Sequence, residues 1–389
     1  MMSRIAIITG EASGDLHGSL LAKYMRDMCP GIEIWGAGGK RMREAGVNLI
    51  CQSGSTGAIG IVESLKLVPG LLMEYFRVRR ELLRRRPDVL VLIDFGAFNK
   101  RVLGFARRHG IKTVYYIPPG AWRKKRRNPG MAQMADKVIT PFDWSYRIFK
   151  DAGIDVTLVG HPLLDIVKPR LSEQEFRQRF NLRPDSRLVA LLPGSRKQEI
   201  THISPALLRA AKIIDSQVPD LQYVVAAAGP VRARQIERIR YKTLEGSGGP
   251  DIRIVESMTH DCLAHSCLAL TASGTATLEA AILNTPMVIV YRGSFLSHFE
   301  YLLRAGKALE DHIGLPNIIA EKTICPELLS QQASPEMIAR LAVELLLEPS
   351  KAAAMKEELA KVRSTLGKEG GARMAAKVVL EAAGLLSTN

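Results

Sequence analysis

Cysteine is scarce in this sequence, and the few cysteines present form no recognisable framework. There are five among 389 residues, and none stands in a CxxC pair or beside spaced histidines. An odd, unpaired set of this kind fits a protein of the reducing cytoplasm better than a disulfide-stapled one. The amino terminus, MMSRIAIITG, leads directly into an apolar strand pattern without a charged segment and a long apolar run. We therefore expect neither a signal peptide nor a membrane-spanning helix.

Glycine motifs that identify common nucleotide sites are also missing. In GAGGKR, residues 36–41, Arg41 stands where the dinucleotide fingerprint requires its third glycine. No glycine stands five residues before Gly39, as a P-loop would require, and no GxSxG elbow occurs. These absences argue against NAD binding, a P-loop phosphate site and a serine hydrolase of that type.

Basic residues exceed acidic ones by 54 to 39, which gives a formal net charge of +15. Arginines are concentrated in residues 77–86, and a second basic run, RKKRR, follows at 123–127. Upstream, residues 61–76 are rich in leucine, valine and methionine. Pro69 and Gly70 are expected to break them into two amphipathic pieces. Apolar residues beside a basic helix suit an interfacial membrane contact; the alternative is a helix packed on the sheet with solvated arginines. Nucleic acid is disfavoured because the basic runs lack interleaved aromatics. The candidates for contact with an anionic acceptor or membrane are Arg79, Arg80, Arg123 and Lys124.

Apolar strand-like runs alternate with helical patterns along most of the chain, which indicates βα units and parallel sheets. A polar, proline-containing stretch near residues 166–186 separates two such series. We predict an α/β protein with two Rossmann-like domains, at residues 1–168 and 186–345. A helical tail, residues 346–389, is expected to pack back across the domains.

Two segments of the first domain carry ionisable side chains at the carboxyl end of an expected strand, where open α/β folds bind ligands. The loop TGEASGDLHG places Glu11, Asp15 and His17 among three glycines directly after the first strand. The buried run VLVLI ends at Asp94. The alternative for each is local: an aspartate or serine that caps a helix, and a histidine satisfied on a first turn.

Two loops of the second domain each open a helix after an apolar strand. LLPGSRKQEI contains Gly194, Ser195 and Arg196, and TASGTATLE contains Ser273, Gly274, Thr275 and Glu279. Backbone N–H groups at a helix start, together with an arginine, suit a diphosphate, and a carboxylate one turn later can accept hydrogen bonds from ribose hydroxyls. Ordinary capping is the alternative. Asn317, in LPN, is a weaker candidate because asparagine is also a good N-cap.

Seven motifs, taken together and in order, resemble those of the lipid-A-disaccharide synthase family across nearly the whole chain: GEASGDLHG, GIVESL, IDFGAFN, VGHPLLD, LLPGSRKQEI, TASGTATLEAAILNTPMVIVYR and IGLPNIIA. The resemblance implies a GT-B fold, in which two Rossmann-like domains face a central cleft. It also implies an inverting, metal-independent glycosyltransferase without a cofactor. The implied reaction transfers 2,3-diacylglucosamine from UDP to 2,3-diacylglucosamine 1-phosphate, and forms a β-1,6 disaccharide and UDP.

The same resemblance implies where the protein works and what the candidate residues do. It implies a cytoplasmic protein held peripherally at the inner membrane, with a homodimer possible. UDP binding is implied for Arg196, for the SGT loop and Glu279, and more weakly for Asn317. The absence of a DxD triplet agrees with a site that uses arginine and helix starts in place of a metal ion.

The segment IDFGAFN departs from the family pattern, which resembles IDxPDFN. Asp94 and Asn99 match, but Ala97 stands where the second acid, the family's favoured general base, is expected. The following IPPGAWRKKRR is shorter and lacks a second tryptophan. We therefore take Asp94 as the candidate base, with Glu11, Asp15 and His17 as alternatives. Other functions kept open are a relative with another acceptor, a UDP-N-acetylglucosamine epimerase, and a membrane-associated nucleotide-sugar sensor.

Overall fold

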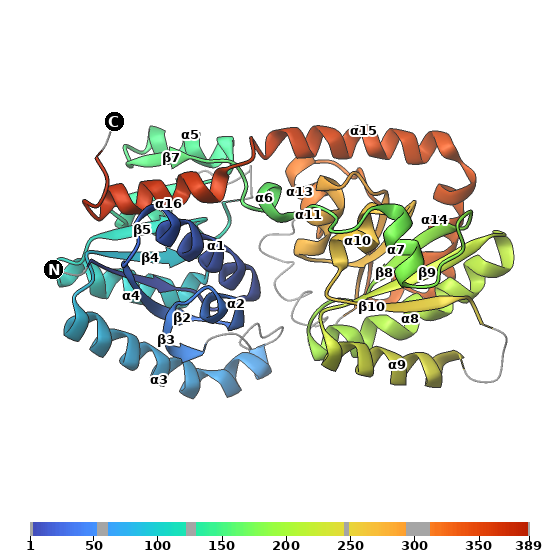
Figure 1. Ribbon diagram of the computed structural model, residues 1–389, viewed down its shortest axis with the longest axis horizontal. Coiled ribbons are helices and arrows are strands. Elements are labelled where there is room, and N and C mark those ends of the chain that lie inside the picture. Colours follow the sequence, from blue (N-terminus) through green and yellow to red (C-terminus); the bar gives the residue numbers. More distant parts are fainter. Residues whose placement is uncertain (1–2, 53–60, 122–129, 245–248, 293–311, 388–389) are drawn as a thin grey trace. The chain divides into compact units, whose positions relative to one another are not determined.

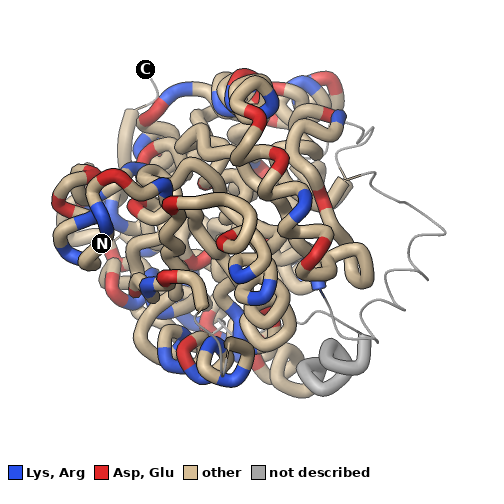
Figure 2. Tube along the Cα trace, turned by 90° about the vertical axis from the view of Figure 1, so that its right-hand side faces the viewer, with Lys and Arg blue, Asp and Glu red and all other residues tan. Residues whose placement is uncertain are grey.

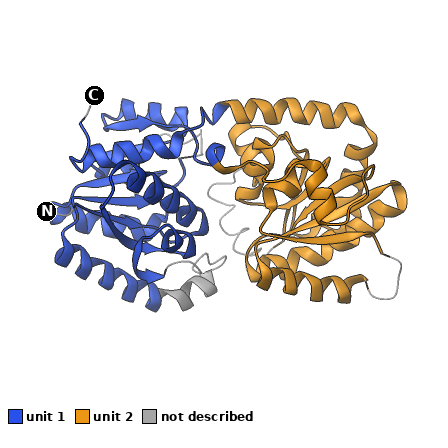
Figure 3. Cartoon of the chain, in the orientation of Figure 1, with its two compact units in different colours: residues 1–165, 365–389 blue, residues 166–364 orange. Residues whose placement is uncertain are grey.

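A computed structural model describes residues 3–52, 61–121, 130–244, 249–292 and 312–387 of the chain. Within this part, two compact units are found, each with its own parallel sheet between helices (Figure 3). The first unit comprises residues 1–165 and 365–389, and the second comprises residues 166–364. The chain therefore passes from one unit to the other twice, at Asp165–Ile166 and at Ser364–Thr365.

The first sheet has the strand order β3-β2-β1-β4-β5-β6-β7, and every pairing in it is parallel. Its strands are β1 (Arg4–Ile8), β2 (Glu33–Gly38), β3 (Asn48–Gln52), β4 (Val89–Ile93), β5 (Thr113–Tyr116), β6 (Lys137–Thr140) and β7 (Val156–Leu158). The helices are α1 (Ala12–Met28), α2 (Lys40–Glu44), α3 (Ile61–Arg85), α4 (Gly96–Arg108), α5 (Asp143–Asp151), α6 (Leu163–Ile166) and α16 (Gly371–Ala382), with a 3-10 turn at Gly130–Met134 (Figure 1).

Alternate residues of the central strands serve two apolar cores, one on each face of this sheet. Ile5 and Ile7 of β1 lie in one core with Leu21 of α1 and Val379 of α16. The intervening β1 residues belong to the other core, together with apolar residues of α3 and α4. Because both faces are covered, the strands read as nearly continuous apolar runs in the sequence.

The second sheet has the order β10-β9-β8-β11-β12-β13, again with parallel pairings only. Its strands are β8 (Arg187–Leu192), β9 (Leu221–Ala227), β10 (Ile252–Glu256), β11 (Leu268–Ala272), β12 (Met287–Tyr291) and β13 (Glu327–Leu329). The helices are α7 (Glu173–Arg179), α8 (Lys197–Gln217), α9 (Pro230–Leu244), α10 (Thr259–Ala264), α11 (Thr275–Ile282), α13 (Leu315–Ala320), α14 (Pro335–Leu347) and α15 (Pro349–Thr365), with a 3-10 turn at Ser330–Gln332.

The carboxyl-terminal helices are divided between the units. Helix α14 packs on α8 and α15 belongs to the second unit, whereas α16 packs on α1 in the first unit. The segment predicted as one tail, residues 346–389, thus contributes to both units.

Helix α3 corrects one prediction from the sequence. Pro69 and Gly70 were expected to break residues 61–76 into two pieces, but the helix runs through both from Ile61 to Arg85. Both residues are exposed, so water can satisfy the backbone carbonyl that proline leaves unpaired, and the helix continues.

Candidate functional site

Each sheet reverses its strand order at one point, and the candidate loops of each unit stand at that point. In the first sheet the reversal lies between β1 and β4, and these strands are followed by Glu11 and Asp94. In the second it lies between β8 and β11, which lead into the loops of Gly194–Arg196 and Ser273–Thr275. Open α/β sheets bind ligands at the carboxyl ends of their strands at such switch points. The topology thus brings together, within each unit, segments that are about 80 residues apart in sequence.

The backbone at Asp94 adopts an uncommon conformation that neighbouring side chains hold in place. Asp94 and Phe95 both have positive φ, 44° and 53°. Two consecutive left-handed residues that are not glycine are costly, and such strain gathers at functional sites. Asn99 donates from Nδ2 to the Asp94 carbonyl at 2.8 Å, and Tyr115 donates its hydroxyl to the same oxygen at 3.0 Å. Sequence analysis noted Asn99 only as a match to the family motif and did not predict this role.

Burial gives the Asp94 carboxyl the pKa of a plausible general base. Desolvation, and secondarily the charge of Glu11, raise its pKa to about 7. A base of this pKa is partly ionised at neutral pH and accepts a proton readily. Ala97, in the first turn of α4, adds no ionisable group. The left-handed backbone of Asp94 and the raised pKa of its carboxyl are the two observations that favour it as a base.

Asp15 is occupied by the protein itself. Its Oδ1 accepts hydrogen bonds from the backbone N–H of Gly39 at 2.7 Å and of Met42 at 3.1 Å, and its Oδ2 accepts from that of Arg41 at 3.0 Å. The carboxylate therefore caps the start of α2, 24 to 27 residues away along the chain. This favours the structural alternative for Asp15.

His17 lies in a buried cluster with Tyr116 and His161, at ring-centroid distances of 6.2 Å to each. Burial, and secondarily the charge of Arg41, lower the pKa of His17 to about 4, so the imidazole is neutral at pH 7. Burial likewise lowers the pKa of His161 to about 3. The exposed fraction of His17 is only 7%, which disfavours direct contact with a substrate.

The loop after β8 has the form of an anion-binding nest, and a side chain of the protein occupies it. Gly194 has φ 103°, and the backbone N–H groups of Ser195 and Arg196 donate to Glu199 Oε2 at 3.0 and 3.1 Å. Arg196 Nη1 also lies 3.1 Å from Glu199 Oε1. A carboxylate thus takes the place at which a phosphate would receive the same donors. Glu199 was missed from the sequence, although it stands three residues after Arg196, the N-cap of α8, which is the spacing of a capping box.

The loop after β11 also contains a glycine with positive φ and is held by a neighbouring segment. Gly274, at φ 144°, precedes α11, whose first residue is Thr275. Ser273 donates its hydroxyl to the Ile313 carbonyl at 2.9 Å. Further along α11, Glu279 Oε2 lies 3.8 Å from Nε2 of His260, a residue of α10 that sequence reasoning did not select.

Asn317 is fully engaged inside the second unit. Its Nδ2 donates to the Cys325 carbonyl and to Glu327 Oε1, and its Oδ1 accepts from the N–H groups of Ile324 and Cys325, at 2.7–2.9 Å. Glu327 in turn accepts from the N–H groups at 313 and 314. Asn317 is thus placed to shape the segment that meets the Ser273 loop, with its own polar atoms already satisfied.

The basic candidates differ in environment. Arg79 lies over the ring of Phe105, with 4.5 Å between the guanidinium carbon and the centroid, and Arg80 has a side chain 79% exposed. Arg123 and Lys124 lie outside the described residues. In the view of Figure 2, Lys and Arg are interspersed with Asp and Glu along much of the chain.

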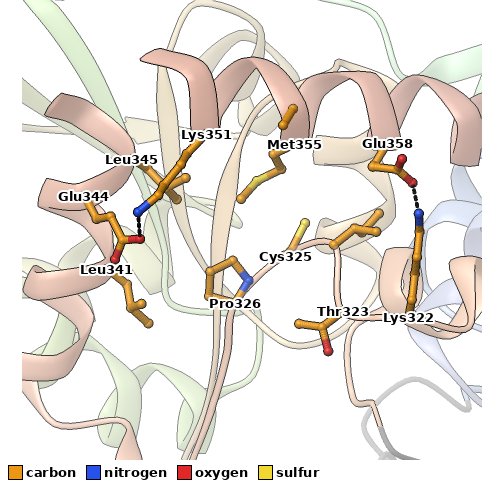
Figure 4. A pocket seen from close by; sticks show the side chains of 12 residues that line it. Lys322, Thr323, Cys325, Pro326, Leu341, Glu344, Leu345, Lys351, Met355 and Glu358 are labelled. Carbon is orange, nitrogen blue, oxygen red and sulfur yellow. Dashed lines mark hydrogen bonds and ion pairs between the residues drawn. The ribbon is translucent and has the colours of Figure 1, made fainter. Parts of the chain in front are cut away.

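A cavity of about 500 Å³ in the second unit lies away from these loops. It opens beside Pro326, at the start of β13, and apolar side chains of α14 and α15 line it (Figure 4). The ion pairs Lys351–Glu344 and Lys322–Glu358 stand at its margin. Because the strands are parallel, the start of β13 marks the sheet edge opposite to the candidate loops. No group of three or more metal-ligating side chains is found in the part of the chain that the structure describes.

Comparison with solved structures identifies the fold. The chain is similar to the S. aureus MnaA-UDP co-structure, with a TM-score of 0.62 at 13% identity over 100% of this chain and 99% of that one. It is also similar to Acinetobacter baumannii MurG, with a TM-score of 0.57 at 12% identity over 97% and 99%. The architecture of two Rossmann-like units is that of the GT-B fold, as predicted.

Comparison with sequences identifies the family. A family model described as lipid-A-disaccharide synthetase matches residues 5–382. The chain is 36% identical to the lipid-A-disaccharide synthase of Syntrophus aciditrophicus over 377 residues, which cover 97% of each chain. It is 35% identical to that of Geobacter sulfurreducens over 384 residues, 98% of this chain and 97% of the relative. The resemblance seen in the motifs is confirmed: this chain belongs to the lipid-A-disaccharide synthase family of glycosyltransferases.

Proposed function

We propose that this protein transfers 2,3-diacylglucosamine from its UDP derivative to 2,3-diacylglucosamine 1-phosphate, forming the β-1,6-linked lipid A disaccharide and UDP. The observation that supports the residue assignments is the position of the two sets of loops, each at the switch point of its own sheet. One set carries a base of suitable pKa and the other carries donors for an anion. These are the two requirements of a transfer from a nucleotide diphosphate to a hydroxyl.

The second unit binds the donor in this proposal. The N–H groups of Ser195 and Arg196 receive the diphosphate in place of Glu199, and the Arg196 guanidinium adds positive charge. The loop of Ser273–Thr275 approaches the same ligand, with Glu279 directed to the ribose hydroxyls. Asn317 shapes the adjoining segment from within.

The first unit supplies the base. Asp94 removes the proton of the acceptor hydroxyl as that oxygen attacks the anomeric carbon from the face opposite to UDP, which inverts the configuration. General-base help of this kind is worth about a hundredfold to ten-thousandfold in rate. Glu11 acts through Asp94 by raising its pKa.

Helix α3 gives the protein a means to meet its lipid substrates. Leu72, Met73 and Phe76 are exposed by 48%, 70% and 57%, and Arg79 and Arg80 follow on the same helix. Exposed apolar side chains next to cations favour peripheral binding to an anionic membrane, here the inner surface of the cytoplasmic membrane. Across the ranges that the structure describes, no helix meets the length and apolarity needed to cross a bilayer. A homodimer, which the family resemblance allows, would be identified by the mass of the purified protein in light scattering.

The decisive experiment measures UDP release from UDP-2,3-diacylglucosamine in detergent, with and without 2,3-diacylglucosamine 1-phosphate. We expect wild-type protein to release UDP only with the acceptor, and Asp94→Asn to lose this activity. Ala97→Asp restores the acid of the family pattern and is expected to be no less active than wild type. Release of UDP without acceptor would contradict the transferase, and activity that appears only in Ala97→Asp would contradict Asp94 as the base.

A further inference from the structure

An arginine that sequence reasoning did not select lies against the loop after β8. Helix α9 follows β9, the neighbour of β8, so its first turn stands at the same sheet edge as the Gly194–Arg196 loop. Within that turn, Arg232 donates from Nε to the carbonyl oxygen of Ser195 at 3.1 Å. Its side chain therefore reaches the loop whose N–H groups are proposed to receive the diphosphate.

Charge distinguishes Arg232 from Arg196. The Arg196 guanidinium is paired with Glu199 at 3.1 Å. Arg232 makes hydrogen bonds to a carbonyl and to the amide oxygen of Gln235 at 3.3 Å, and no carboxylate of the described residues pairs with it. A guanidinium has five N–H donors, so Arg232 keeps donors and a full positive charge for another acceptor.

The position of Arg232 is fixed through Gln235. The Gln235 side chain, besides accepting from Arg232, donates from Nε2 to the Lys197 carbonyl at 2.8 Å and to Thr201 Oγ1 at 3.0 Å. These bonds attach the first turns of α8 and α9 to each other. Arg232 as a residue is partly buried and its side chain is held by these bonds, which limits the side-chain entropy that binding would cost.

We propose that Arg232 is a second cation of the donor site, which binds the diphosphate of the UDP-sugar and stabilises the charge on the departing UDP. This proposal rests on the function proposed above. A nucleoside diphosphate carries more negative charge than the single guanidinium of Arg196 can neutralise, even after the diphosphate has displaced Glu199. An unpaired guanidinium with free N–H donors is the group best suited to supply the remainder.

The alternative is that Arg232 only holds the loop in shape through the Ser195 carbonyl. Replacing a residue that only holds the loop in shape would weaken the binding of every ligand of the loop. Replacing a residue that binds the diphosphate would weaken binding more as the ligand carries more phosphate groups. Uridine, UMP and UDP therefore separate the two roles.

The experiment is isothermal titration of uridine, UMP and UDP into wild-type protein and the variants Arg232→Gln, Arg232→Lys and Arg234→Gln. Arg234 is exposed on the same helix, so its replacement makes the same change in net charge away from the loop. We expect Arg232→Gln to raise the Kd of UDP about tenfold and that of UMP less, with uridine unchanged. Arg232→Lys should recover part of the loss, and Arg234→Gln should stay within about twofold of wild type. Thermal melting checks that each variant is folded.

Three results would overturn the proposal: equal losses for uridine and UDP, no loss for UDP in Arg232→Gln, or an equal loss in Arg234→Gln. Arg196→Gln distinguishes this failure from failure of the donor site itself. If Arg196→Gln weakens UDP binding and Arg232→Gln does not, the donor site stands and Arg232 is excluded from it. If neither variant weakens UDP binding, the loop does not bind the diphosphate. The assignment of this loop to the donor site and the proposal for Arg232 then both fail.

Discussion

Asn99 donates a hydrogen bond of 2.8 Å to the main-chain carbonyl of Asp94, and thereby holds the carboxylate at the end of β4 in a left-handed backbone conformation. The same Nδ2 lies 3.2 Å from the Ile93 carbonyl, so one amide joins the last residue of the strand to the turn that follows. These hydrogen bonds from Asn99 fix the main chain at Asp94, and the Asp94 side chain is not needed to cap the helix that follows. They account for how Asp94 keeps an uncommon backbone conformation at the end of a fully buried strand.

The pH dependence of turnover tests the electrostatic link between Glu11 and Asp94. A carboxylate base must be ionised, so kcat/KM should rise with pH through a limb near 7. Glu11→Gln removes a negative charge that raises the pKa of Asp94, and the limb should therefore move to lower pH. Burial is the larger cause of the raised pKa, so part of the elevation should remain.

Glu44→Gln is the matched control for this pH profile, because Glu44 is exposed in the same unit and pairs with Lys40. It should leave the limb in place. A limb that does not move in Glu11→Gln would mean that Glu11 does not raise the pKa of the base. A limb that persists in the residual activity of Asp94→Asn would mean that another group is the base.

Stability should also respond to Asp94. Because folding raises the pKa of this carboxyl from 3.8 to about 7, its ionisation favours the unfolded state. This destabilisation grows as pH rises from 3.8 to about 7 and is then constant. Asp94→Asn should therefore raise the melting temperature at pH 8 relative to wild type. At pH 3.5, where the carboxyl is mostly protonated in both states, the difference should vanish. Melting curves of both proteins at the two pH values check this, and a gain of equal size at both would contradict it.

Asp15→Asn should act on folding and not on chemistry. The carboxylate accepts three backbone N–H groups at the start of α2, and an asparagine side chain turns one acceptor into a donor facing another donor. We expect a loss of about 2–3 kcal/mol in the free energy of unfolding by urea. The control is Asp27→Asn, on the exposed face of α1, the helix that carries Asp15. It should change the free energy of unfolding by less than about 0.5 kcal/mol. A large fall in kcat without loss of stability would return Asp15 to the candidate bases.

The sequence was sufficient to predict the sheets and the loops at their ends, because buried parallel strands and glycine-rich loops are local patterns. It could not reveal which of the ionisable residues in GEASGDLHG would be buried or hydrogen-bonded within the protein and so be withdrawn from substrate. Asp15 is engaged by a helix that begins 25 residues later, and His17 is enclosed with an imidazole 144 residues away. Likewise, the contact between Arg232 and Ser195 arises only when β8 and β9 pair. Contacts of this range depend on topology, which composition and periodicity do not encode.

Glu199→Gln tests whether the carboxylate in the nest competes with phosphate. The amide oxygen can still accept from the N–H groups of Ser195 and Arg196, which both donate to one oxygen of Glu199, but the negative charge is gone. UDP should therefore bind several-fold more tightly, because it displaces a weaker occupant and meets an unpaired Arg196. Titration of UDP into the two proteins measures the change. Weaker binding by the variant would mean that Glu199 holds Arg196 for the ligand and is not displaced by it.

Gly160→Ala should destabilise the first unit at the place where the carboxyl-terminal segment joins it. A Cβ at Gly160 would come within 1.8 Å of the Lys368 carbonyl oxygen, which is backbone and cannot turn aside. The next residue, His161, donates its N–H to the Leu366 carbonyl at 2.8 Å. A shift of either chain segment at this contact would therefore also break that hydrogen bond. We expect a loss of about 2–3 kcal/mol in the free energy of unfolding.

Gly70→Ala is the same chemical change as Gly160→Ala, but it should raise the free energy of unfolding, not lower it. Gly70 is exposed inside α3, with no atom within 4 Å of an added Cβ, so alanine should stabilise the protein by about 0.5–1 kcal/mol through helix propensity. Urea unfolding of both variants measures the two signs. If Gly160→Ala were as stable as wild type, the VGHPLLD motif would not be needed to hold the last helix. Its place in the family pattern would then require a role in binding. If the loss appears, the motif is explained by close backbone packing between residues 160 and 368, with no substrate involved.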